Sequence, residues 1–183
     1  MFLRLVPVSN VPQGILDRVR SELEANLNMK CRIMPRLQIP EEAFNRWRKQ
    51  YNAETILSML SEKSEVKFID KSIPTIMITD VDLYYGGLNF VFGLEYPAKS
   101  SAIVSITRLR PEFYDERTNI NLLGERTVKE VTHEIGHHLG LRHCYNTWCV
   151  MCFSPSVNDI DIKQKGFCEN CKIKLMTNGI NIG

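Results

Sequence analysis

The first third of the chain switches between the two-residue period of strands and the longer period of helices. Residues 2–8 are mostly apolar and predict a strand. Over residues 13–28, apolar side chains recur every three or four positions, which predicts an amphipathic helix. Alternation over residues 31–37 indicates a second strand. Pro40 and the acidic residue after it are typical of a helix start, so a second helix is expected over residues 41–61.

The middle of the chain predicts further strands and one long helix. Residues 73–79 form a near-continuous apolar run, as expected of a strand that is buried on both faces. Residues 88–94 and 102–109 are rich in strand-forming side chains and could pair antiparallel. Polar residues follow, and then a helix is expected whose buried face carries four apolar side chains, Val128, Val131, Ile135 and Leu139.

This order of elements indicates an α/β fold. Strand, helix, strand and helix precede three strands and the long helix. Such an order suits a mixed, mostly parallel twisted sheet that is backed by helices and has one antiparallel edge strand. Beyond the long helix the pattern is weak. Only short helices are expected there, one near residues 157–165 and one after Cys168.

Composition narrows the function classes without identifying one. Apolar content of 44% and charged content of 24% are those of an ordinary soluble globular protein. A net charge of +2 is too small to argue for nucleic acid or an anionic membrane as partner. No apolar run reaches membrane-spanning length and the apolar start is too short for a signal peptide, so a cytoplasmic location is expected. The basic stretch at residues 46–49 could contact nucleic acid, but a solvated helix face with Trp47 in the core is favoured.

The sequence HEIGHHLGLRH, residues 133–143, carries the strongest chemical signal. On a helix, His133 and His137 lie one turn apart on one face, so both can reach a single metal ion. Gly140 tolerates positive φ, and the helix is therefore predicted to end there. After that turn His143 can approach the same metal, which a continued helix would not allow.

Three neutral imidazoles suit a zinc ion and leave its fourth position open for water. Glu134 points beside that metal position, which suits a base that takes a proton from the water. His138 fits no ligand position and is interpreted as a surface or packed histidine. The alternative is a helix end with solvated histidines and no metal.

Six cysteines raise the choice between disulfides and metal ligands. Without an export signal, metal ligands are favoured. Four of the cysteines have the spacing C-x4-C…C-x2-C, which is typical of tetrahedral zinc, while disulfides or an iron centre remain alternatives. These four are Cys144, Cys149, Cys168 and Cys171. Cys31 is expected to be a buried inert thiol, and Cys152 could replace one of the four.

The combined pattern HEIGHHLGLRHCYNTWCVM…FCENC resembles the archaemetzincins, a branch of the metzincin zinc metalloproteases. The upstream stretch DLYYGGLNFVFGLEYP is similar to that family as well. The resemblance implies an α+β zincin-like fold with two zinc ions. The three histidines would bind the catalytic zinc, Glu134 would be the general base, and the four cysteines would hold a structural zinc. Met151 would be the Met-turn residue beneath the metal. Phe153 stands where some other metzincins have a tyrosine, so no hydroxyl is available there.

The same resemblance gives residues 89–93 the role of the antiparallel edge strand above a substrate cleft, where a peptide could add as a further strand. The whole chain, residues 1–183, would be a single metzincin-like catalytic domain. Residues 1–139 would form an upper lobe with the zinc helix. Residues 140–183 would form a lower lobe that is too poor in apolar periodicity to fold without its metal.

The expected activity is hydrolysis of peptide bonds in a peptide or protein substrate, by a monomer that needs no nucleic acid or membrane. An aminopeptidase needs an acid to hold the free amine, and the sequence places neither Asp82 nor Glu95 for that role. The alternative is a non-catalytic zinc-binding module on the same fold that binds peptides without cleaving them. A further hypothesis is that Cys168→Ser weakens catalytic-zinc affinity, because Cys144 adjoins His143 and the thiolate zinc would fix that loop.

Overall fold

The computed structural model describes residues 2–61 and 73–180. Its main sheet has five strands in the order β2-β1-β5-β8-β7. All neighbouring strands are parallel except β7, which runs antiparallel to β8 at the sheet edge. The five strands are β1 (Phe2–Val8), β2 (Lys30–Ile33), β5 (Thr75–Thr79), β7 (Gly93–Tyr96) and β8 (Ser101–Ser105). The predicted α/β fold with an antiparallel edge strand is therefore confirmed.

The boundaries of the edge strand differ from the prediction. Strand β7 begins only at Gly93, and the preceding residues 85–92 form a turn and an irregular wall. The two glycines at 86 and 87 bend the chain there, and Gly86 has a φ of 53°. The expected strand over residues 102–109 also ends early, at Ser105, where the 3-10 turn η3 (Thr107–Leu109) follows. Short 3-10 turns also occur at η2 (Pro97–Lys99) and η4 (Pro111–Tyr114).

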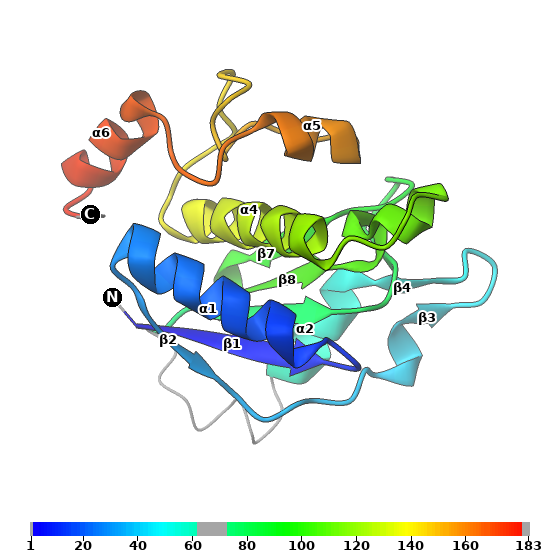
Figure 1. Cartoon of the computed structure of the whole chain (residues 1–183). Coiled ribbons are helices and arrows are strands. Elements are labelled where there is room, and N and C mark those ends of the chain that lie inside the picture. The colour runs from blue at the N-terminus through cyan, green and yellow to red at the C-terminus, as the bar shows by residue number, and fades with distance from the viewer. Residues whose placement is uncertain (1, 62–72, 181–183) are drawn as a thin grey trace.

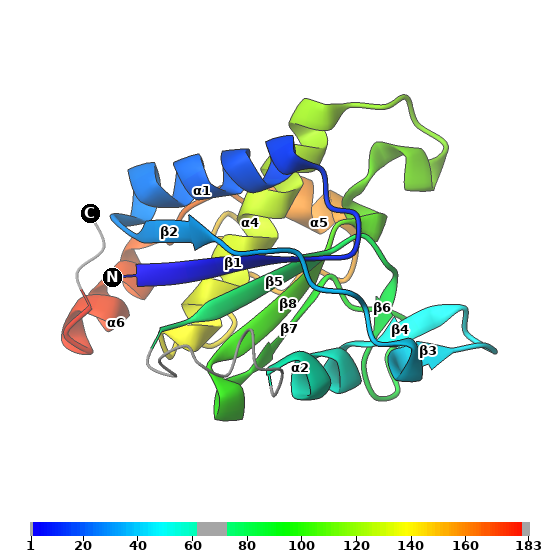
Figure 2. The same cartoon turned by 90° about the horizontal axis from the view of Figure 1, so that it is seen from below.

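Helices cover both faces of the sheet, as Figures 1 and 2 show. Helices α1 (Gln13–Leu27) and α4 (Ile120–His138) lie on one face, and α2 (Ala53–Ser61) lies on the other. Because successive side chains of a strand point to opposite faces of the sheet, each strand contributes side chains to the apolar layers on both faces. In β5, Ile78 packs with α1 and α4, whereas Met77 packs with α2. The sheet is thus buried on both faces, as its apolar runs predict.

The prediction of one helix over residues 41–61 is wrong in its first half. The chain there forms η1 (Glu41–Ala43) and a hairpin of β3 (Phe44–Asn45) and β4 (Gln50–Asn52), and β4 pairs with β6 (Leu83–Tyr84). The Asn45 side chain accepts hydrogen bonds from the amides of Trp47 and Arg48 and so favours a turn over a helix. Trp47 is 97% exposed at the hairpin tip and is not a core residue.

Residues after Gly140 lie on the side of α4 away from the sheet (Figure 1). They contain α5 (Val157–Ile162) and α6 (Glu169–Thr177), close to the short helices that the pattern predicts. Among the described residues, no helix is long and apolar enough to cross a membrane. Helix α4 is therefore sandwiched between the sheet and this last part of the chain, and it can present different faces to each.

Candidate active site

Helix α4 brings the first two histidines together. Its N-cap residue, Asn119, accepts a hydrogen bond from the amide of Leu122, and its apolar face is buried against the sheet. His133 and His137 follow one another by one turn, and their Nε2 atoms lie 3.0 Å apart. The helix then ends as predicted, because Gly140 adopts a φ of 87° and its amide donates to the His137 carbonyl at 2.8 Å.

The turn at Gly140 brings His143 back to the other two imidazoles. Its ring centroid lies 5.3 Å from that of His133 and 4.9 Å from that of His137. One ligand nitrogen from each of the three rings lies within 4.8 Å of the others. Two nitrogens bound tetrahedrally to one zinc ion are about 3.3 Å apart, given Zn–N bonds of about 2.0–2.1 Å. The three rings therefore fit one zinc ion with little rearrangement. His138 lies outside this group.

Backbone carbonyls fix the tautomers of two of the rings. His133 Nδ1 lies 2.8 Å from the Val150 carbonyl oxygen, and His137 Nδ1 lies 2.9 Å from that of Leu141. A carbonyl can only accept, so each Nδ1 carries the proton and each Nε2 keeps its lone pair for a metal. Burial lowers the pKa of His133 to about 2 and also lowers the pKa of His137 and His143. All three imidazoles are thus neutral near pH 7 and ready to bind a cation.

Glu134 lies next to the histidines, under strand β7. Its side chain is buried, and desolvation raises the pKa of its carboxyl well above the usual value, with the charges of Glu130 and Glu95 adding to the effect. The absence of a side chain at Gly93 makes this position possible, because a Cβ there would clash with the Glu134 carboxylate. A carboxylate in such surroundings is a stronger base than one in water.

A cleft of about 450 Å³ opens between β7 and the histidines. One wall is formed by residues 85–95, and the opposite side by residues 153–155. Glu130, on the turn of α4 before His133, and Lys163 complete the lining. The cleft is mostly apolar with a few polar groups near the imidazoles, which is the usual character of a binding site for an organic substrate.

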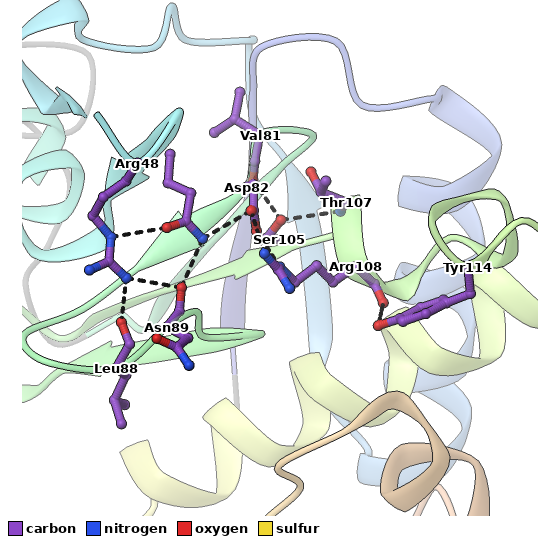
Figure 3. A network of polar contacts seen from close by, with 10 residues as sticks. Arg48, Val81, Asp82, Leu88, Asn89, Ser105, Thr107, Arg108 and Tyr114 are labelled. Carbon is purple, nitrogen blue, oxygen red and sulfur yellow. Dashed lines mark hydrogen bonds and ion pairs between the residues drawn. The ribbon is translucent and has the colours of Figure 1, made fainter. Parts of the chain in front are cut away.

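The β3–β4 hairpin anchors the irregular wall of this cleft, as Figure 3 shows. The Arg48 guanidinium donates to the carbonyls of Leu88 at 2.6 Å and Asn89 at 3.0 Å. The Gln50 amide also donates to the Asn89 carbonyl, at 2.9 Å, and to Asp82, at 3.0 Å. These bonds satisfy backbone groups that no strand pairing satisfies, so the wall is held in place although residues 85–92 are not a strand.

The two acidic residues that the sequence could not place lie in different settings. Asp82 accepts two hydrogen bonds from the Arg108 guanidinium, at 2.7 and 2.8 Å (Figure 3), and belongs to the anchoring network. Glu95 lies two residues after Gly93 on β7, on the same strand face, and lines the cleft. Burial raises the pKa of the Glu95 carboxyl. Only Glu95 of the two can therefore meet a substrate in the cleft.

The four predicted cysteines converge at a second site. The Sγ atoms of Cys144 and Cys168 lie 3.8 Å apart, and those of Cys149 and Cys171 lie 3.7 Å apart. All four Sγ atoms lie within 4.8 Å of one another. Sulfurs bound tetrahedrally to zinc are about 3.8 Å apart, given Zn–S bonds of about 2.3 Å. A disulfide needs about 2.05 Å, so these distances fit a metal and not a disulfide.

The other two cysteines stand apart from this cluster. Cys31 is half-buried beside β1, and burial raises the pKa of its thiol to about 12, which makes it unreactive at neutral pH. The Cys152 thiol points to the Phe153 carbonyl and does not join the four sulfurs. In the cluster, burial opposes ionisation of Cys168, but hydrogen bonds from the Cys171 amide and the neighbouring thiols outweigh it and lower its pKa to about 7.

Met151 is fully buried. It packs directly onto α4 at Gly136, where a Cβ would clash with the Met151 sulfur. The amide of Cys144 donates to the Met151 carbonyl at 2.9 Å, which closes the loop between the two metal clusters. The Phe153 ring lies against the His143 ring, with centroids 5.2 Å apart and the planes tilted by 53°, so this position brings an apolar ring and no hydroxyl to the histidines.

The sequence did not identify Glu130 and Lys163 as site residues. Their side chains form an ion pair, with Lys163 Nζ 2.9 Å from Glu130 Oε1, and both line the cleft. A signal existed for Glu130 only, because it precedes His133 by three positions and therefore shares a helix face with it. Nothing in the local sequence around Lys163 indicates that its side chain is buried.

Comparison with known proteins agrees with this site. The profile of peptidase family M54 matches residues 7–177. The archaemetzincin of Saccharolobus solfataricus is 43% identical over 176 residues, which cover 96% of this chain and 93% of that protein. The archaemetzincin of Thermococcus kodakarensis is 41% identical over 179 residues, covering 95% of each chain.

Two crystal structures show the same fold. A zinc-dependent peptidase from Methanocorpusculum labreanum superposes with a TM-score of 0.85 at 35% identity, covering 94% of this chain and 99% of that one. An archaemetzincin from Archaeoglobus fulgidus, crystallised with malonate, gives a TM-score of 0.80 at 34% identity, covering 95% and 99%. With relatives this similar over nearly their full lengths, the chain belongs to peptidase family M54, the archaemetzincins, and is a zinc metalloprotease.

Proposed function

We propose that His133, His137 and His143 hold one catalytic zinc ion and that Glu134 is the general base of peptide-bond hydrolysis in the adjoining cleft. The observation that carries this proposal is the convergence of three metal-ready imidazoles beside a desolvated carboxylate at the base of an open cleft. A zinc ion bound there supplies a Lewis acid that polarises the scissile carbonyl and makes a water molecule more acidic.

Glu134 then moves the proton. A buried carboxylate whose pKa is raised takes a proton from the attacking water more readily than an exposed one, and the resulting acid can give it to the leaving amine. Gly93 leaves room for the carboxylate, and β7 keeps bulk water from it. His133 and His137 stay oriented by the carbonyls of Val150 and Leu141 throughout.

Strand β7 gives the substrate a backbone to bind. It is the edge of the sheet, paired with β8 on one side and facing the cleft on the other. An extended peptide can add to such an edge through main-chain hydrogen bonds, with alternate side chains directed into the cleft. This supports a peptide or protein substrate.

The second part of the proposal is a structural zinc on Cys144, Cys149, Cys168 and Cys171, which makes two zinc ions per chain. The four sulfurs have the separations that tetrahedral zinc requires. Thiolates that must stay reduced to bind metal favour the cytoplasm as the compartment. Residues 1–183 would then work as one catalytic domain, and we propose that they do so as a monomer.

A cleavage assay on a peptide library, combined with metal analysis, tests this function. The native protein should contain about two zinc ions, and Glu134→Gln should keep both while losing about 10²–10⁴-fold in cleavage rate. Glu169→Gln, a change on the exposed start of α6, is the matched control and should cleave normally. Equal products from native protein and Glu134→Gln would remove the hydrolytic mechanism and favour a peptide-binding module of the same fold.

A further inference from the structure

A buried ion pair lies at the base of the cleft and is not explained by the hydrolytic scheme. The Lys163 side chain is 0% exposed and that of Glu130 is 5% exposed, with Nζ and Oε1 2.9 Å apart. Glu130 comes from α4, one turn before His133. Lys163 directly follows α5, on the other side of the cleft. Among the described lining residues, Lys163 is the one lysine or arginine.

Lys163 also holds the loop that carries Met151. Its ammonium donates to the Cys152 carbonyl at 3.3 Å. Two positions earlier in that loop, the Val150 carbonyl accepts from His133 Nδ1 at 2.8 Å and sets the orientation of that ring. A continuous chain of contacts therefore leads from Glu130 through Lys163 and the loop to His133. It begins and ends on helix α4, which carries both Glu130 and His133.

Stability alone is a poor reason for this pair. Removing both charges from water is costly, and replacing a buried ion pair with apolar residues of similar volume is often neutral or stabilising. Moreover, Glu130 Oε1 is close to Lys163 but has no hydrogen bond of good geometry from any described residue. The two charges are thus close enough to attract each other, but Glu130 Oε1 lacks a well-aligned hydrogen bond. A buried polar atom without such a bond lowers the stability of the fold, so a purely structural role does not explain the contact.

We propose that Lys163, held by Glu130, is a positioning residue for the catalytic zinc site: it fixes the loop at Val150–Cys152 against α4 and so orients His133. This inference rests on the proposed zinc site and deepens it. Groups that orient metal ligands from behind usually change metal affinity or activity about 10–100-fold when they are removed. The Lys163 charge also acts on all three imidazoles, where it adds to the effect of burial in keeping them neutral.

The test compares three variants at the ion pair. Lys163→Met leaves Glu130 buried without its partner and is expected to lower the melting temperature. Glu130→Met combined with Lys163→Met removes both charges at similar volume, so stability should return. Lys163→Arg keeps the charge but changes the donor geometry. Lys172→Met, which breaks the exposed pair with Glu169 on α6, is the matched control.

The decisive readout is metal affinity of the three-histidine site, measured by competition with a chelator. Cobalt titration separates the two sites, because thiolate ligands give charge-transfer absorption and imidazoles do not. The double Met variant is expected to bind metal about 10–100-fold more weakly at the histidines while its melting temperature matches the native protein. Lys163→Arg should show a smaller loss of the same kind, and Lys172→Met should show none.

Native affinity at the histidines in the double Met variant would overturn the inference and leave a merely structural pair. The inference would also be overturned if Lys163→Arg and Lys163→Met both folded and both bound metal at the histidines with native affinity. Failure of the proposed function gives a different result. A native protein that binds zinc at the histidines but cleaves no peptide would refute hydrolysis, whereas the metal affinities of the Lys163 and Glu130 variants would still test the positioning role.

Discussion

The sheet region, residues 2–61 and 73–139, and the metal region, residues 140–180, are built on different principles. In the sheet region, β5 and β8 are buried at every position, and two apolar layers cover the faces of the sheet. In the metal region, α5 and α6 each bury only two residues. Hydrophobic burial therefore suffices for the first region, whereas the proposed sulfur ligands and the Lys163–Glu130 ion pair would help to fix the loops of the second.

The metal region has more apolar packing than its sequence pattern predicts. Many of its buried residues join the core on α4, and these include Leu141, Val150, Met151, Val157, Ile160, Phe167 and Leu175. Leu141, Val150, Met151 and Phe167 come from irregular segments, where no helical or strand period reveals them, whereas Val157 and Ile160 belong to α5 and Leu175 belongs to α6. The comparison shows that the two regions pack on the same helix, α4. It buries one face against the sheet, and it presents His133 and His137 toward the metal region, which supplies His143.

Removal of metal should separate the two regions most strongly. Binding of a structural zinc is worth on the order of 10 kcal/mol, so a chelator should abolish hydrogen-exchange protection in α6 and the cysteine loop. Strands β1, β5 and β8 should keep their protection, because their packing involves no metal. Equal loss of protection in both regions would show that the sheet region also needs metal to fold.

Truncation in the sheet core should have the next largest effect. Ile78 is fully buried between β5 and the helices α1 and α4, and Ile78→Ala is expected to lower the free energy of unfolding by about 2–5 kcal/mol. Ile173→Ala removes the same atoms from an exposed site on α6 and should change stability by less than about 0.5 kcal/mol. Chemical denaturation of the two variants checks this difference.

The boundary between the regions can be disturbed at one glycine. In Gly136→Ala the new methyl group would collide with the Met151 sulfur and come within 2.9 Å of Phe167, at an expected loss of about 1–3 kcal/mol in stability. Gly14→Ala, in α1, meets no atom within 4 Å and should be neutral or stabilising by up to about 1 kcal/mol. Similar melting temperatures for these two variants would contradict the close contact of Met151 with α4.

Coupling between the two metal sites should be smaller. In Cys168→Ser the cysteine loop loses one ligand, and since Cys144 adjoins His143 we expect about tenfold weaker metal binding at the histidines, or about 1.4 kcal/mol. Cys31→Ser, at a free thiol that belongs to neither cluster, is the control. Metal titration of the folded variants measures the effect, and unchanged affinity in Cys168→Ser would show that the sites are independent.

A pH dependence of the metal-free protein is the last expected effect. The folded pKa of His133 is about 2 because of burial, whereas an unfolded histidine has a pKa of about 6.5. The unfolded state therefore binds more protons below about pH 6.5, and stability should fall as the pH decreases from there. The raised pKa of Glu134 acts in the opposite direction.

Comparison with His133→Gln isolates the histidine contribution to this pH dependence. Denaturation of both proteins at about pH 7.5 and about pH 5 should show a steeper loss of stability in the native protein. A steeper loss in His133→Gln would contradict the depressed pKa.

Tertiary contacts account for the largest differences from the sequence-based prediction. Residues 41–52 carry a helix start signal, yet they form a hairpin because Asn45 caps a turn and β4 pairs with β6, which is distant in the chain. The sequence predicts a strand from residue 88, yet residues 88–92 are irregular, and side chains of Arg48 and Gln50 replace strand pairing there. A local pattern cannot show which distant residue satisfies a backbone group.

The sequence by itself determined the period of the main strands and helices, the end of α4 at Gly140 and the two groups of side chains, three histidines and four cysteines, that we propose bind metal. These features depend on spacings of a few residues, and helix geometry converts such spacings directly into neighbours. Only the tertiary structure decided that Gly93 makes room for Glu134, that Glu95 faces the cleft and that Lys163 reaches Glu130. Those contacts join segments far apart in the chain, and packing of the two regions on α4 brings them together.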